Sequence, residues 1–105
     1  MSLNFQSIRN DTFDEVPLEL KKNNVAIDLT DATIRMQLRK EAGGVIAFAP
    51  ILTITNAVNG LFKINKQIIN CDAFNYMYDI EIAFSDGTVK TWISGYFLIK
   101  NDITR

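Results

Sequence analysis

The chain has 105 residues, of which 48% are hydrophobic and 22% charged, and its 11 basic and 12 acidic side chains give a net charge of −1. A chain of this length forms one domain, residues 1–105, around one core. The near-neutral balance excludes the basic surface that a nucleic-acid backbone rewards. No apolar run approaches the ~18 residues of a membrane span, and no leader pattern is visible. We therefore expect neither nucleic acid nor a membrane as a partner.

The chain contains one cysteine, Cys71, and no histidine. A single cysteine forms no internal disulfide, which fits a reducing compartment or a particle assembled in one. Without histidine, the usual Ser/His/Asp and Cys/His sets for nucleophilic catalysis cannot form, and zinc has no ligand set. We expect no catalytic residues, no metal and no cofactor, and we interpret Cys71 as a small, partly buried residue.

Short stretches of alternating apolar and polar residues, separated by turn residues, predict a chain of β-strands. In chain order, the predicted strand segments are 12–22 (interrupted near Pro17), 25–28, 32–40, 45–48, 51–55, 61–64, 76–85 and 88–100. Turns are predicted at 28–31, 41–44 and 56–60, and a single helical turn at 66–72. Residues 1–3 are set aside as a candidate cloning remnant. No helix period is sustained, and the pattern is that of an all-β sandwich or barrel.

Asp86-Gly87 lies between two alternating runs and predicts a hairpin with a two-residue type I′ turn. That turn sets a register in which five residue pairs share the core face: Phe84 with Val89, Ile82 with Thr91, Ile80 with Ile93, Tyr78 with Gly95, and Tyr76 with Phe97. Gly95 leaves room for the ring of Tyr78. The residues predicted to be buried together are Ile34, Met36, Leu38, Ile80, Ile82, Ile93, Phe97 and Ile99.

The opposite face of the same hairpin carries Asp79 and Glu81, about 6.6–7 Å apart at the rise of a strand. This spacing suits a paired-carboxylate hydrolase. The arginines of the segment 32–40 form a matching polar face, and cross-strand ion pairs stabilise sheets. We favour the ion-pair interpretation, because a catalytic pair also needs a cleft.

Three large side chains, Trp92, Tyr96 and Met77, are predicted on this outward face. Two interpretations stay open: Trp92 packs under a loop or terminal segment, or the residues form a contact surface, where Trp, Tyr and Met are enriched. The candidate interface consists of Trp92, Tyr96, Met77, Arg35, Gln37 and Arg39. The rival is a carbohydrate-binding module in which Trp92 and Tyr96 are a stacking platform.

Three segments resemble a known family. They are residues 28–39 (DLTDATIRMQLR), residues 78–81 (YDIE) followed by 86–89 (DGTV), and residues 95–99 (GYFLI) followed by 102–105 (DITR). In order and spacing they are similar to the N-terminal immunoglobulin-like domain of phage baseplate upper proteins and related phage or prophage tail proteins. Asp31 stands where glycine is common in that family, so we expect a positive φ there.

The resemblance implies an immunoglobulin-like antiparallel β-sandwich of about seven to eight strands with at most one short helical turn. It implies a non-enzymatic structural role in assembling a phage tail or baseplate, with other tail subunits or further copies of this chain as partners. The expected location is the virion, after assembly in the bacterial cytoplasm. The chain ends at Thr104-Arg105, where similar proteins often continue, so we expect a stand-alone module or one part of a longer protein.

Overall fold

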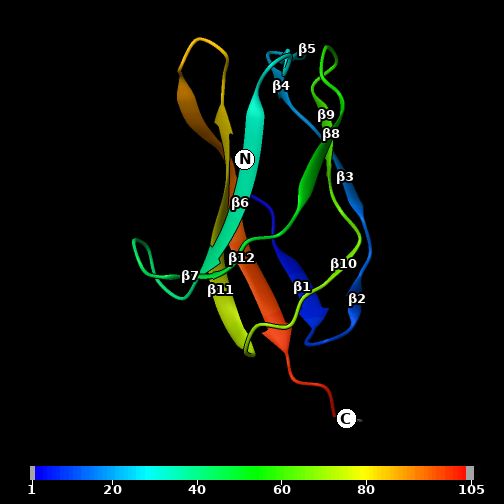
Figure 1. Cartoon of the computed structure of the whole chain (residues 1–105), viewed down its shortest axis with the longest axis vertical. Helices are drawn as coiled ribbons and strands as arrows, with labels where there is room; N and C mark the ends of the chain where they lie inside the picture. The colour runs from blue at the N-terminus through cyan, green and yellow to red at the C-terminus, as the bar shows by residue number, and fades with distance from the viewer. Residues whose placement is uncertain (1, 104–105) are drawn as a thin grey trace.

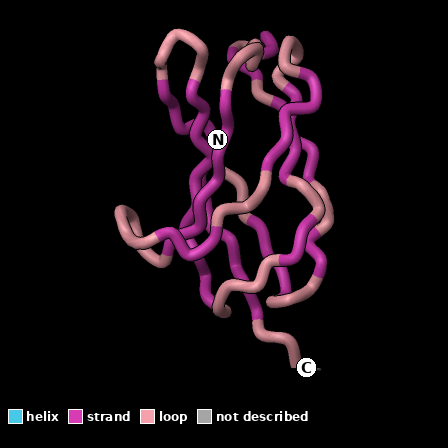
Figure 2. The backbone as a smooth tube through the Cα atoms, in the orientation of Figure 1, coloured by secondary structure: helices cyan, strands magenta, loops and turns pink. Residues whose placement is uncertain are grey.

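Twelve β-strands and no helix make up residues 2–103, the part of the chain that this computed structural model describes (Figures 1 and 2). The strands are β1 (Phe5–Ile8), β2 (Thr12–Phe13), β3 (Val16–Glu19), β4 (Lys21–Lys22), β5 (Val25–Ala26), β6 (Thr33–Arg39), β7 (Ile46–Phe48), β8 (Leu52–Asn56), β9 (Leu61–Ile64), β10 (Gln67–Ile68), β11 (Phe74–Ala83) and β12 (Val89–Lys100). The all-β prediction is confirmed. In this part of the chain, no helix could cross a membrane. Residues 104–105, which end the predicted motif 102–105, lie outside the described residues.

The strands form two facing layers, as in a β-sandwich (Figure 1). One layer is a five-stranded sheet in the order β1-β12-β11-β6-β7, and the other is a three-stranded sheet in the order β3-β9-β8. The short pair β2–β10 continues the antiparallel register of β3–β9, and β4 pairs with β5. Pro17 lies in the edge strand β3, as the missing N–H of proline requires.

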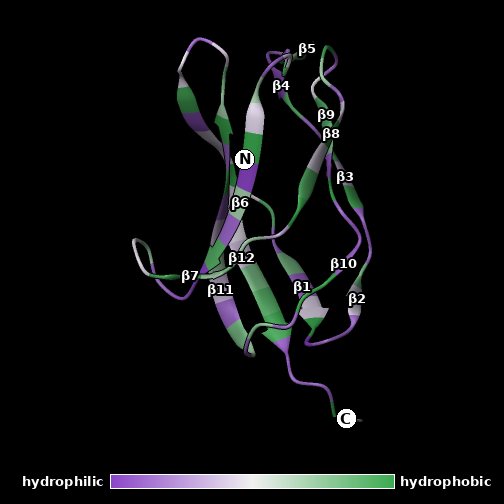
Figure 3. Ribbon diagram, viewed as in Figure 1, coloured by the Kyte–Doolittle hydropathy of each residue, from purple (hydrophilic) through white to green (hydrophobic). Residues whose placement is uncertain are grey.

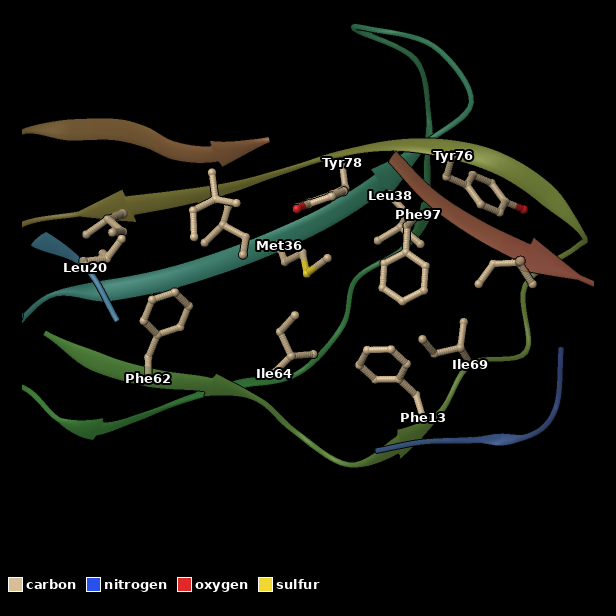
Figure 4. Close-up of a cluster of buried hydrophobic side chains, with 14 of the residues drawn as sticks. Phe13, Leu20, Met36, Leu38, Phe62, Ile64, Ile69, Tyr76, Tyr78 and Phe97 are labelled. Atoms are coloured by element: carbon tan, nitrogen blue, oxygen red, sulfur yellow. The ribbon is translucent and has the colours of Figure 1, made fainter. Parts of the chain in front are cut away.

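The core fills the space between the two layers, because each sheet turns one face of its alternating strands inward. Figure 3 shows this alternation as hydrophobic and hydrophilic bands along β6 and β11. In Figure 4, Phe62, Ile64 and Phe13 of one layer face Met36 and Phe97 of the other. The buried cluster comprises Phe13, Leu20, Leu29, Met36, Leu38, Phe62, Ile64, Ile69, Tyr76, Tyr78, Ile80, Ile82, Ile93, Phe97 and Ile99. Seven of the eight predicted core residues are in it, and the eighth, Ile34, is half-buried against it.

The β11–β12 hairpin has the predicted outer register but a different turn. Ile80 lies opposite Ile93, Tyr78 opposite Gly95 and Tyr76 opposite Phe97, as predicted. Nearer the turn, however, Ile82 lies opposite Lys90 and Ala83 opposite Val89, so the predicted inner pairs are wrong. The hairpin departs from the predicted geometry at two places. Each shifts the cross-strand pairing by one residue, in opposite directions, so the outer pairs stay as predicted.

The first departure is the turn itself, which has three loop residues, Ser85, Asp86 and Gly87. The amide of Gly87 donates to the carbonyl of Phe84 (3.0 Å), and the amide of Phe84 donates to the carbonyl of Thr88 (2.8 Å). Of these three residues, Gly87 has a positive φ, +89°. This is a hairpin with a three-residue loop that ends in a left-handed glycine, rather than the predicted type I′ turn.

The second departure is a β-bulge in β12. Glu81 lies opposite Thr91 while its neighbour Ile80 lies opposite Ile93, so Trp92 is the extra residue of the ladder. A bulge leaves one residue without a cross-strand partner and re-aims its side chain. The alternation of faces is therefore broken at Trp92 alone and resumes at Ile93.

Strand β1 was not predicted, and it pairs in parallel with β12 from Phe5 opposite Phe97 to Ile8 opposite Lys100. Setting aside residues 1–3 was wrong for Leu3. Its amide donates to the carbonyl of Ser94 (3.1 Å), and its carbonyl accepts a 2.7 Å hydrogen bond from the hydroxyl of Tyr78. Backbone of this segment, rather than the ring of Tyr78, occupies the space that Gly95 leaves open.

The predicted helical turn at 66–72 is wrong, because this segment is extended. Gln67–Ile68 form β10 and pair with β2, and the extended chain carries Ile69 into the core. The segment ends where the hydroxyl of Tyr76 donates to the carbonyl of Asp72 (2.6 Å). Burial raises the pKa of Tyr76 to about 12. The expected positive φ at Asp31 is confirmed, at +59°.

Replacing Gly87 tests the turn. Gly87→Val should lower the free energy of unfolding by about 1–2 kcal/mol, because a β-branched residue resists positive φ. A Cβ there meets no atom within 4 Å, so the cost is conformational and not steric. Gly87→Asn is the control and should cost less, because Asn tolerates this conformation. Urea unfolding measures both, and equal stability of the Val variant and wild type would contradict the turn.

Replacing Gly95 tests whether the N-terminal segment packs against β12 at this position. A Cβ at Gly95 would lie 1.9 Å from the carbonyl oxygen of Leu3, so Gly95→Ala must displace that segment. We expect a loss of about 1–3 kcal/mol in unfolding free energy. In a chain that lacks residues 1–4, the same substitution should cost much less. An equal cost in both backgrounds would show that Leu3 is not the obstacle.

Truncating Ile80 tests the core. Ile80 is fully buried at the centre of β11, so Ile80→Ala should cost about 2–5 kcal/mol in denaturant unfolding. Val45→Ala is the matched control, because Val45 is 89% exposed and its truncation should change stability by less than about 0.5 kcal/mol. A loss well under ~1 kcal/mol at Ile80 would contradict its central position.

Candidate functional site

The five-stranded sheet turns one face away from the core, and side chains of β6, β11 and β12 meet there. Across the ladders, Arg35 lies opposite Glu81, Gln37 opposite Asp79, and Arg39 opposite Met77, which in turn lies opposite Tyr96. We call this set of residues the outward face. Together with the 41–43 loop, most of it lines an open groove of about 480 Å³.

Ion pairing and hydrogen bonding order the arginines of the outward face. Arg35 donates to the Oε1 atom of Glu81 from its Nε atom (2.8 Å) and also from Nη2, so these residues form an ion pair. Arg39 donates to the Oε1 atom of Gln37 (2.8 Å) and to the carbonyl of Gly44. The expected cross-strand ion pair is confirmed for Glu81. The carboxylate of Glu81 is thus held by Arg35 in the ion pair that the sequence interpretation favoured.

Met77 and Tyr96 supply the apolar part of the outward face. They are cross-strand neighbours, and they are 38% and 49% exposed. The amide of Tyr96 donates to the Oδ1 atom of Asn4 (3.0 Å), which fixes the backbone below the exposed ring. An exposed methionine and tyrosine beside Arg39, on a face that also carries Arg35, have the composition of a protein contact surface.

Trp92 does not lie on the outward face, and its predicted placement there is wrong. The bulge gives its outward position to Thr91, which lines the groove beside Glu81. Trp92 is half-buried against the core and lines a different pocket with Phe84 and Ile27. The structure therefore brings together Tyr96, Met77, Arg35, Gln37 and Arg39 and separates Trp92 from them. Of the two open interpretations, packing describes Trp92 better.

Two further polar residues, Asp28 and Cys71, take part in local structure. Asp28 accepts hydrogen bonds from the amide (2.8 Å) and hydroxyl (2.5 Å) of Thr30, which lower the pKa of its carboxyl and close the predicted turn. Cys71 is half-buried, and burial raises the pKa of its thiol, which disfavours the reactive thiolate. Within residues 2–103, no three acidic or cysteine side chains are grouped as a metal site would need.

Comparison with known proteins adds no relative: no protein-family model matches this chain, and no curated protein sequence matches it significantly.

Proposed function

We propose that this chain is a non-enzymatic, structural protein–protein module of a phage or prophage tail or baseplate, built on an immunoglobulin-like sandwich. The observation that carries the proposal is the outward face, where exposed Met77 and Tyr96 adjoin Arg39 and where Arg35 lies further along the same strand. Aromatic side chains, Met and Arg are the residues enriched at protein interfaces and their hot spots. The sequence resemblance to baseplate domains supports the same role.

The strand order supports the immunoglobulin-like part of the proposal. In such domains, strands G, F, C and C′ form one sheet and B, E and D belong to the other. The orders β12-β11-β6-β7 and β3-β9-β8 correspond to these two sets. The hydrogen bond from Tyr76, near the start of β11, to Asp72 resembles the tyrosine corner at the start of strand F. Counting β2–β4 as one strand and β9–β10 as another reduces the twelve strands to nine, close to the expected seven to eight.

The proposed partners are other tail or baseplate subunits or further copies of this chain, and the proposed location is the virion. A mixed surface of this kind suits assembly, because ordered arginines give specificity while the apolar side chains give contact area. Met77, Arg35 and Arg39 line the same open groove, so a partner can reach apolar and charged residues together.

The alternative, a carbohydrate-binding module with an aromatic sheet face, draws less support. Its stacking platform requires Trp92 and Tyr96 on one face. Trp92 lines another pocket, so Tyr96 is the single aromatic side chain of the proposed platform. A contact surface for protein needs no second ring beside Tyr96.

Removing the apolar part of the outward face tests the proposal. Met77→Ala combined with Tyr96→Ala should leave the melting temperature nearly unchanged, because both side chains are exposed. Self-association, measured by sedimentation over a concentration series, should weaken by about 2 kcal/mol or more. Val58→Ala with Ile68→Ala is the control, because both residues are exposed away from this face.

Proteins encoded by neighbouring genes are the candidate partners in the same experiment. If neighbouring genes encode tail proteins, co-purification with each of them should be lost in the Met77/Tyr96 double variant and kept in the control. A wild-type chain that stays monomeric and binds none of those neighbours would overturn the assembly role. Neighbouring glycosidase genes would favour the carbohydrate-binding alternative.

A further inference from the structure

A second pocket, at the end of the sandwich that carries the β11–β12 turn, is unused by the proposed assembly role. It has a volume of about 460 Å³, within the range of small-molecule sites. We call it the end pocket, and its lining residues are Lys22, Ile27, Phe84, Ser85, Asp86, Thr88, Lys90 and Trp92. Figure 1 shows the β11–β12 turn and the β4–β5 hairpin at the same end of the molecule.

The bulge in β12 gives this pocket its largest side chain. In an unbroken ladder Trp92 would point to the outward face, opposite Glu81. The extra residue instead leaves Trp92 on the side of Phe84 and Ile27, half-buried and packed against the core. Bulges that re-aim a side chain occur next to functional sites. Because Trp92 packs against the core beside Phe84, the two side chains offer a rigid apolar wall to a ligand.

Charge in the end pocket favours an anion. Two basic residues, Lys22 and Lys90, line it together with one acidic residue, Asp86. The carboxylate of Asp86 already accepts a 2.9 Å hydrogen bond from the amide of Thr88. Neither lysine takes part in an ion pair among residues 2–103. Hydrogen bonds from Thr88 and the charge of Lys90 lower the pKa of the Asp86 carboxyl, so the lining carries one positive charge in excess, with which a ligand carboxylate forms charge-assisted hydrogen bonds.

We propose that the end pocket binds the carboxylated ring of an acidic sugar, a uronic or a sialic acid. The apolar face of the sugar ring packs against Trp92 and Phe84, and the carboxylate meets Lys22 and Lys90. Ser85 belongs to the same lining, and its hydroxyl group bonds a sugar hydroxyl. This ligand uses the aromatic wall, the positive charge and the polar turn of the pocket at once. The inference does not depend on the assembly role of the outward face.

Trp92 makes the proposal directly measurable, because it is the sole tryptophan of the chain. Glucuronic acid and N-acetylneuraminic acid oligosaccharides are titrated separately, and glucose oligosaccharides serve as the neutral counterpart. We expect a saturable change in tryptophan fluorescence with at least one acidic sugar, at least about tenfold tighter than with glucose. Which acid binds more tightly identifies the sugar. Added salt should weaken the binding.

The variant Lys22→Gln/Lys90→Gln should weaken this binding about tenfold, because two exposed charge pairs are lost. Lys66→Gln/Lys100→Gln removes the same charge elsewhere on the surface and should change binding by less than about twofold. Self-association should be unchanged in both variants, which separates this site from the outward face. No saturable response, equal binding of glucose or of a tetraglutamate peptide, or equal loss in both double variants would overturn the proposal.

Discussion

The hydrogen-bonded ladder between β11 and β12 is the interaction on which the rest of the structure depends. These are the two longest strands and the centre of the five-stranded sheet: β6 pairs with β11, β1 pairs with β12, and β7 joins through β6. The inward side chains of the same ladder, from Tyr76 to Ile82 and from Ile93 to Ile99, form much of the core wall. Its register therefore decides which residues the second layer packs against and which remain for contacts outside the domain.

Much of this arrangement could be predicted from the period of two in the sequence. Alternation along β6, β11 and β12 was enough to find the core face, because a slip of one residue would expose Ile80 and Ile82 together. The prediction that the arginines of β6 share a face with the carboxylates of β11 followed from the same logic, and the structure pairs Arg35 with Glu81. Pattern could not reveal the bulge at Trp92, since the longer turn and the extra residue cancel and leave the outer pairs unchanged.

The remaining errors have separate physical causes. Strand β1 is short, and its partner lies at the other end of the chain, so no local signal points to a parallel pairing. At 66–72, polar residues suggested a helical turn, but pairing with β2 and the burial of Ile69 favour the extended form. The candidate site was found except for Trp92, and the end pocket was missed because turn residues distant in sequence create it.

The parallel pairing of β1 with β12 also has a mechanical consequence. The first strand and the last strand run in the same direction, and hydrogen bonds from Leu3 to Ser94 and from Arg9 to Lys100 extend their contact at both ends. A pull between the two chain ends draws these strands past each other along their length. The bonds between them then bear the load together, in shear, rather than opening one after another. A domain tied in this way resists stretching from its ends before its core is exposed.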